Sequence, residues 1–207
     1  VTGINMDENE IEKIIRAILL IDVGDRIEFS FEKLVPIRED DDYNNFRAHF
    51  IANYGKIANK MKIDITTGDA ITPGAIRYSY RTILDNDEIG VMAYNTETII
   101  AEKYETIIRR NIGTTRARDF YDLHMFYNLY KDSINLETLR LAVSRTAKKR
   151  SSLETMTEWA EIIEDMKADR ALKNLWNNYC ANNIYASEVS FEDVMETVEH
   201  IAELLGF

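Results

Sequence analysis

The spacing of hydrophobic residues changes along the chain and predicts a different kind of structure in each part. Over residues 7–21, isoleucines recur three and four positions apart, which predicts an amphipathic helix that begins at Asp7 and ends before Gly24. Apolar and polar residues then alternate, and this alternation is typical of half-buried strands. The strands predicted in this way cover residues 26–31, 46–52, 61–65, 78–84 and 89–94. The acidic run Glu39–Asp42 is expected to form a turn, and residues 85–88 a hairpin connection.

From residue 96 to the end, the hydrophobic spacing is helical throughout. The predicted helices cover residues 96–111, 115–131, 135–149, 154–168, 169–183 and 190–205. The side chains expected to cap them are those of Thr96, Thr115, Asn135 and Ser190. Strands followed by helices predict the α+β class, with an antiparallel or mixed sheet. We therefore expect an α/β domain over 1–95 and an all-helical domain over 96–207.

Composition excludes several classes of protein and site. The chain of 207 residues carries 25 Lys and Arg against 36 Asp and Glu, a net charge of −11, which argues against a general nucleic-acid coat protein. Its single cysteine, Cys180, cannot form an internal disulfide or a thiolate zinc site, and three scattered histidines make a histidine metal site improbable. There is no apolar run of roughly 18 residues, so no membrane association is expected and a cytoplasmic location is the default.

The predicted strand at 61–65 carries the first candidate site. Because side chains alternate along a strand, Lys62 and Asp64 share one face of it. A carboxylate fixed on a rigid strand suits the hard Mg²⁺ ion, which takes oxygen ligands. The alternative is an ordinary strand whose polar face lies in water.

A lysine on the apolar side of the helix at 96–111 is the second candidate. Lys103 follows Ile99 by four residues and precedes Ile107 by four, so it lies on the hydrophobic stripe. Such a lysine extends its amine to solvent, pairs with an acid, or faces a cleft where it can neutralise a phosphate. The structural alternative combines an extended lysine with an i, i+4 ion pair between Glu105 and Arg109.

The third candidate is the start of the next helix, Thr114–Leu123. Asp119 and Asp122 lie three residues apart, Arg118 can pair with Asp122, and Arg109 or Arg116 can bridge to Asp119. Carboxylates in a first helical turn also favour the helix dipole, so these pairs can be purely structural. The cationic run between Arg145 and Arg150 is predicted to be a solvated helix end.

The order of these motifs resembles a known family. Lys62-Ile63-Asp64-Ile65 precedes Ala101-Glu102-Lys103, which precedes Thr115-Arg116-Ala117-Arg118-Asp119-Phe120-Tyr121-Asp122-Leu123. This series resembles the AbiEii/AbiGii nucleotidyltransferase toxins of type IV toxin–antitoxin and phage abortive-infection systems, which look like DNA polymerase β-type nucleotidyltransferases. The motifs cover roughly residues 60–130. Arg118 departs from the pattern, because the family more often has lysine there, and the two cations hold phosphate differently.

The resemblance implies roles for particular residues. Asp64 would be a metal-binding carboxylate with Lys62 beside it, and Lys103 and Asp119 would belong to the two later catalytic motifs. The residues implied to bind substrate around them are Glu102, Arg109, Arg116, Arg118 and Asp122. Mg²⁺, an NTP, an RNA acceptor and a cognate antitoxin are the implied cofactor and partners.

One part of the family pattern is absent from the sequence. No Gly-Gly or Gly-Ser turn followed by Asp-x-Asp precedes the helix at 7–21, and the chain opens Val1-Thr2-Gly3 without an initiator methionine. We therefore expect further metal carboxylates upstream, and little or no activity from these 207 residues alone.

The sequence thus predicts a nucleotidyltransferase that moves a nucleotide from NTP–Mg²⁺ to an acceptor such as an RNA end. The main alternative is a non-catalytic nucleotide- or protein-binding module in which the acidic and basic residues form a structural network. A third possibility is a helical regulator whose acidic surface binds a basic partner.

Overall fold

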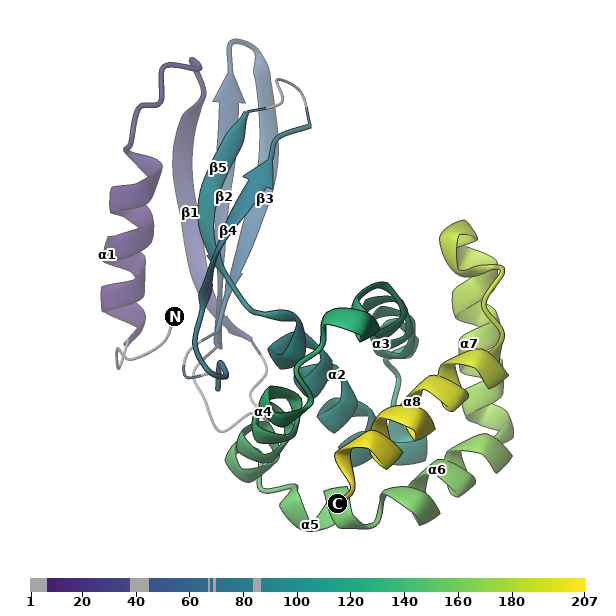
Figure 1. The fold of residues 1–207 in the computed structure, drawn as a ribbon. Helices are drawn as coiled ribbons and strands as arrows, with labels where there is room; N and C mark the ends of the chain where they lie inside the picture. The colour runs from purple at the N-terminus through teal and green to yellow at the C-terminus, as the bar shows by residue number, and fades with distance from the viewer. Residues whose placement is uncertain (1–6, 38–44, 67, 69, 84–86) are drawn as a thin grey trace. The chain divides into compact units, whose positions relative to one another are not determined.

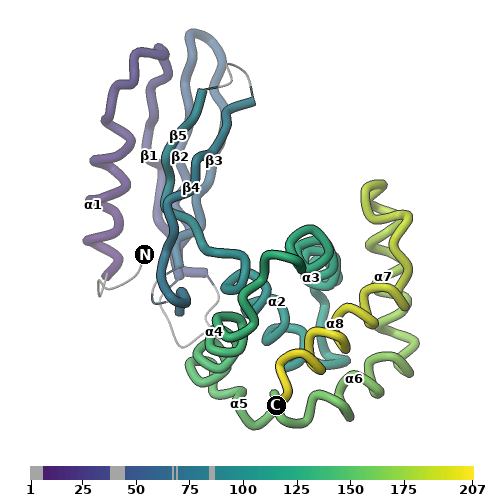
Figure 2. The backbone as a smooth tube through the Cα atoms, viewed as in Figure 1, coloured from purple at the N-terminus to yellow at the C-terminus, as the bar shows by residue number. Residues whose placement is uncertain are grey.

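The computed structural model describes residues 7–37, 45–66, 68, 70–83 and 87–207. The chain divides into two compact units, Val1–Asp69 and Ala70–Phe207, and each is described by itself (Figures 1 and 2). The turn predicted at Glu39–Asp42, and residues 85 and 86 of the predicted hairpin connection, lie outside the described residues.

The first unit is one helix on a three-stranded antiparallel sheet. Helix α1 (Glu8–Leu19) precedes β1 (Glu28–Ile37), β2 (Asn45–Tyr54) and β3 (Ile57–Ile65), and the strand order is β1-β2-β3. The Asp7 side chain caps the helix at the amide of Glu10, as predicted. The apolar face of the helix meets the sheet in a small core formed by Ile11, Ile15, Leu34, Phe46, Ala48 and Ile65.

Strand β1 is longer than the predicted segment, which ended at residue 31. The pairing of β1 with β2 shifts between Phe31 and Lys33, and such a bulge reverses the alternation of side chains that a sequence pattern relies on. Pro36 lies near the end of β1, which is an edge strand of this sheet, and edge strands are where sheets tolerate proline.

The second unit begins with an antiparallel hairpin of β4 (Ile76–Arg81) and β5 (Glu88–Ala93), in which Tyr78 pairs with Val91. Helices follow to the end of the chain. They are α2 (Thr96–Arg110), α3 (Ala117–Tyr130), α4 (Leu136–Lys149), α5 (Leu153–Thr157), α6 (Trp159–Ala168), α7 (Arg170–Asn182) and α8 (Phe191–Leu205). Three single-turn 3₁₀ helices connect them: η1 (Asn111–Gly113), η2 (Lys131–Ser133) and η3 (Ile184–Ala186).

One hydrophobic core holds these helices together. Its largest fully buried side chains come from α2, α3, α4, α5, α6 and α8: Tyr104, Ile100, Ile107, Ile108, Leu123, Leu139, Met156, Ile163, Met166, Met195 and Ile201. Helix α7 joins the core through Leu172 and Trp176 and leaves its other side exposed.

Of the four caps predicted after residue 95, two are confirmed and two are wrong. Asn135 and Ser190 accept hydrogen bonds from the amides of Thr138 and Asp193. Helix α2 is instead capped by Asn95, whose side-chain oxygen accepts from the amide of Thr98. At α3 the cap position is Arg116, while Thr114 accepts a hydrogen bond from the Arg116 amide. The helix predicted at 154–168 is interrupted at Glu158.

The predicted α+β class is confirmed, and the described pairings within both sheets are antiparallel. The domain boundary placed between residues 95 and 96 stays a prediction. None of the helices in the described part of the chain is long and apolar enough to span a bilayer.

Candidate functional site

The candidate site in the second unit is built where α2 turns into α3. Asn111, at positive φ, ends α2, and the short η1 turn returns the chain so that α3 lies beside α2. The Thr114 hydroxyl holds the amide of Arg116 at the entry to α3. This short connection brings Lys103, near the middle of α2, next to the first turns of α3, as the sequence predicted.

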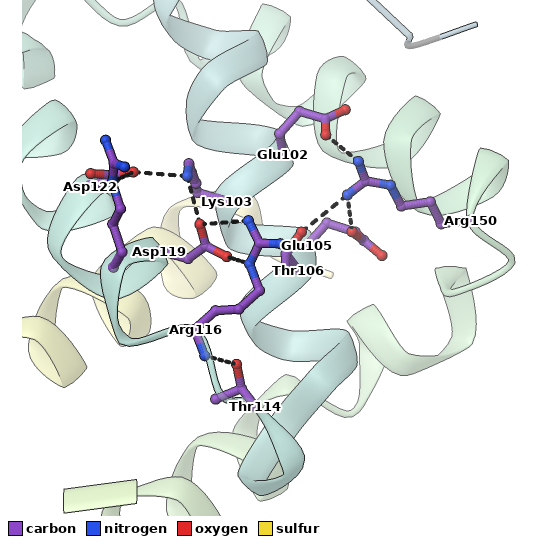
Figure 3. Close-up of polar contacts among 10 residues, drawn as sticks. Glu102, Lys103, Glu105, Thr106, Thr114, Arg116, Asp119, Asp122 and Arg150 are labelled. Carbon is purple, nitrogen blue, oxygen red and sulfur yellow. Dashed lines mark hydrogen bonds and ion pairs between the residues drawn. The ribbon is translucent and has the colours of Figure 1, made fainter. Parts of the chain in front are cut away.

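Lys103 joins the two carboxylates of α3 (Figure 3). Its Nζ atom lies 2.6 Å from Asp119 Oδ1 and 2.9 Å from Asp122 Oδ2. An ammonium group has three N–H donors, so these two hydrogen bonds leave one donor for another acceptor. The Lys103 side chain is 24% exposed and can therefore offer that donor outward.

Arg116 binds the carboxylate of Asp119 through the oxygen that Lys103 does not contact most closely. Its Nε atom lies 2.5 Å from Asp119 Oδ2, while Arg118 Nε lies 3.6 Å from Asp122 Oδ2. The Asp119 side chain is only 4% exposed, whereas that of Arg118 is 77% exposed. Asp119 is thus the buried centre of the network, and Arg118 is the cation with the greatest freedom to reach a ligand.

Two opposing effects set the pKa of Asp119. Burial by itself raises the pKa, but the hydrogen bonds from Arg116 and Lys103 outweigh it, so the pKa lies below the ordinary value of 3.8. Because the folded-state pKa is the lower one, ionised Asp119 stabilises the fold at all pH values above the ordinary pKa. That stability is lost only as the pH falls from about 3.8 through the folded-state value.

We expect this pH dependence to be visible in the variant Asp119→Asn. The difference in unfolding free energy between wild type and variant should be constant from pH 7 to about pH 5 and shrink below pH 4. Urea unfolding at each pH measures it, and the ¹³Cγ shift of Asp119 reports its titration directly. A carboxyl that titrates at or above 3.8 would show that the cations do not hold it as described.

These residues line an open pocket of about 590 Å³. One wall comes from α2 and the start of α3 and carries three cations against two carboxylates: Lys103, Arg116, Arg118, Asp119 and Asp122. The opposite wall comes from α7 and the residue after it: Leu175, Asn178, Tyr179, Asn182 and Asn183. The volume lies within the range of small-ligand sites.

A second network of ion pairs on α2 contains Glu102 and Arg109, the remaining predicted site residues of the second unit. Arg150 hydrogen-bonds both Glu102 and Glu105 (Figure 3). Arg109 Nε also reaches Glu105 Oε1, at 2.7 Å. Glu105 is fully buried and also accepts a hydrogen bond from the Ser152 hydroxyl. Glu102 and Arg109 therefore lie in a network that ties α2 to the end of α4, and neither lines the pocket of Lys103.

Arg150 corrects the prediction that the cationic run after Arg145 is a solvated helix end. Its side chain is 26% exposed and pairs with two acids. Burial alone lowers the pKa of Arg150, but Glu102 and Glu105 together raise it above the ordinary value. Arg150 is the C-cap residue of α4, and the next residue, Ser151, has a positive φ of 53°.

Removing Arg150 from its contacts with Glu102 and Glu105 should destabilise the second unit. We expect Arg150→Ala to lower the unfolding free energy by about 3 kcal/mol, because buried Glu105 would keep only Arg109 and Ser152 as partners. Arg145→Ala, at an exposed position of the same run, is the matched control and should change it by less than about 0.5 kcal/mol. Equal effects in urea unfolding would contradict a specific role for Arg150.

The first unit holds the other two predicted residues, Lys62 and Asp64. They project from the same face of β3, where Asp64 pairs with Arg47 and Lys62 with His49 in the register of β2. Arg47 donates to both carboxylate oxygens of Asp64, at 2.6 and 2.8 Å. Lys62 is exposed.

This arrangement does not itself fit a metal ion. Both Asp64 oxygens already accept hydrogen bonds from a guanidinium, which neutralises the charge that a cation would need. No group of three or more His, Cys, Asp or Glu side chains in the described ranges is arranged to hold a metal. The role of Asp64 as a metal ligand stays a prediction, and it requires Arg47 to release the carboxylate.

Two features of these sites were not predicted from the sequence. Arg47 lies on the strand next to Asp64, a proximity that only the register of β2 and β3 reveals. The α7 wall was not among the predicted sites, although Asn178, Tyr179 and Asn182 recur at helical spacing and mark one side of the helix.

Comparison with known proteins gives one family and two solved structures. The sequence model of the family described as "Nucleotidyl transferase AbiEii toxin, Type IV TA system" matches residues 2–197. The crystal structure of JHP933 from Helicobacter pylori is 16% identical, with 97% of this chain and 71% of that one aligned at a TM-score of 0.42. A candidate nucleotidyltransferase from H. pylori is also 16% identical, with 96% and 73% aligned at 0.42. No curated protein sequence matched the chain.

Proposed function

This chain belongs to the AbiEii family of type IV toxin–antitoxin nucleotidyl transferases, and we propose that it transfers a nucleotide from an NTP to an acceptor such as an RNA end. A toxin of this class implies an antitoxin partner. The observation that carries the proposal is the pocket beside Lys103. On its charged wall, the nearly buried Asp119 holds Lys103 in place, and the exposed Arg118 lies at the rim.

The chemistry proposed for this wall is neutralisation and orientation of phosphate. Lys103 keeps one N–H donor after binding Asp119 and Asp122, and those two carboxylates hold its ammonium group in place. Arg118, largely exposed, can fold over a phosphate that enters the pocket. Charges that are fixed before the substrate arrives need little reorganisation during the reaction. Such positioning and electrostatic stabilisation supply most of the rate acceleration in phosphoryl and nucleotidyl transfer.

Asp119 has a positioning role in this proposal. It is almost fully buried and binds both Lys103 and Arg116, so it fixes two cations relative to each other. Asp122 performs the same task for Lys103 and Arg118. Glu102 and Arg109 contribute indirectly, since their network with Glu105 and Arg150 anchors the helix that carries Lys103.

Mg²⁺ enters the proposal as the partner of the NTP. The two-metal chemistry of nucleotide transfer needs several carboxylate oxygens, and Asp64 is bound by Arg47. We therefore expect residues 1–207 alone to bind NTP–Mg²⁺ weakly and to show no turnover.

Transfer of a labelled nucleotide separates the proposal from its alternative, a non-catalytic nucleotide- or protein-binding module. The protein as its gene encodes it is incubated with each α-³²P-labelled NTP, Mg²⁺ and total RNA. Label in RNA that disappears with EDTA supports nucleotidyl transfer. Nucleotide binding without label in any acceptor supports the binding module instead.

A further inference from the structure

The two walls of the Lys103 pocket differ in chemistry. The wall from α2 and α3 is charged, whereas the wall from α7 carries carboxamides, one tyrosine and one leucine. Asn178 and Asn182 are four residues apart on α7, so their side chains lie on the same face of the helix. A ligand between the walls would meet cations on one side and neutral hydrogen-bonding groups on the other.

The carboxamides of this wall differ in their free hydrogen-bonding capacity. Both polar groups of Asn183 are engaged, because its Nδ2 donates to the Tyr179 carbonyl and its Oδ1 accepts from the Tyr185 hydroxyl. Asn182 Nδ2 donates to the Asn178 carbonyl, which leaves its Oδ1 available. Within the described part of the chain, the Asn178 side chain has no hydrogen-bond partner and offers both its donor and its acceptor. Side-chain amides of this kind bind a base edge through paired hydrogen bonds.

Tyr179 provides a fixed aromatic surface beside these amides. Its hydroxyl lies 3.1 Å from that of Tyr185, and its ring packs 5.7 Å from Trp176 and 6.2 Å from Tyr121 between ring centres. Burial, together with the hydrogen bond to Tyr185, raises the pKa of Tyr179, so the ring stays neutral. A neutral, immobilised ring at a pocket wall is suited to stacking on a nucleobase.

We propose that the α7 wall, through Asn178, Asn182 and Tyr179, is the base-reading side of this pocket, while the Lys103 wall binds phosphate. The inference rests on the proposed function, since it takes a nucleotide as the ligand. It deepens that function by naming the residues that select the base. Asn178 is the selecting residue with both polar groups available, and Asn183 and Tyr185 hold the wall in shape.

This inference is tested by NMR titration of the 207-residue chain with metal-free AMP, GMP, CMP and UMP at millimolar concentration. Ribose 5-phosphate serves as the probe without a base. In the wild type, one mononucleotide should bind more tightly than the others, and it should shift the side-chain amide signals of Asn178 and Asn182. In Asn178→Ala, the ratio between the tightest and weakest mononucleotide should fall about fivefold or more, with ribose 5-phosphate affinity unchanged.

Asn177→Ala is the matched control, because Asn177 is exposed on the neighbouring side of α7 and does not line the pocket. It should leave every affinity unchanged. Both substitutions introduce a residue with higher helix propensity, so both variants should fold. If ribose 5-phosphate binds at Lys103 but the base preference is absent or survives in Asn178→Ala, this inference is wrong and the proposed function stands. If neither ribose 5-phosphate nor any nucleotide shifts residues of the pocket, this inference is wrong, and labelled-nucleotide transfer decides the proposed function separately.

Discussion

Lys103→Ala should reduce nucleotide transfer by about 100-fold in the protein as its gene encodes it, with a much smaller effect on folding. The variant removes the ammonium group that binds Asp119 and Asp122. It also removes the N–H donor of that group that is left for a phosphate. Asp119 would retain Arg116, so the unfolding free energy should fall by about 1–3 kcal/mol. Labelled-nucleotide transfer and urea unfolding on the same preparations separate the two effects.

Two further variants complete this experiment. Lys103→Arg keeps the charge but changes its geometry, so it should restore stability better than activity. Lys148→Ala, at an exposed position near the end of α4, should change neither. A Lys103→Ala protein that is destabilised yet transfers nucleotide at the wild-type rate would mean that Lys103 only bridges two helices.

Asp64→Asn should lower activity by several orders of magnitude while the melting temperature changes little. The substitution keeps the shape of the side chain and removes the charge that a metal would use. The side chains of its ion pair with Arg47 are 33% and 44% exposed, and pairs accessible to solvent contribute little to stability. Transfer rates as a function of Mg²⁺ concentration, with thermal unfolding as the companion measurement, test this expectation.

The variant Arg47→Gln is the counterpart of Asp64→Asn, because it removes the other charge of the same ion pair. If Arg47 competes with a metal for Asp64, removing its charge should lower the Mg²⁺ concentration needed for half-maximal activity. If the two residues form only a structural pair, Asp64→Asn and Arg47→Gln should have equally small effects. A fully active Asp64→Asn protein would remove Asp64 from the site.

The sequence predicted well what depends on regular periodicity. Helical spacing placed Lys103 on the buried side of its helix, and the short turn after it predicted that Asp119 would lie alongside, which the 2.6 Å hydrogen bond confirms. Regular alternation identified most of β2 and the second half of β3, since the predicted strands 46–52 and 61–65 lie within Asn45–Tyr54 and Ile57–Ile65. β1 was cut short because its bulge changes the alternation in the middle of the strand.

What the sequence could not predict depends on long-range packing. Arg150 resembles its exposed neighbours in the sequence, and only the packing of α4 beside α2 brings it to Glu102 and Glu105. The α7 wall likewise looks like any polar helix face, because nothing local indicates that α3 lies opposite it. Such contacts link residues more than forty positions apart, beyond the reach of any periodic pattern.

Photolabelling tests most directly whether nucleotide occupies the Lys103 pocket. The protein as its gene encodes it is irradiated with 8-azido-ATP or 5-azido-UTP, and the labelled peptides are identified by mass spectrometry. The account predicts adducts on α7 near Tyr179, suppressed by excess unlabelled nucleotide and strongly reduced in Lys103→Ala. Absence of label from α7 and α3, or adducts that persist under competition, would contradict it.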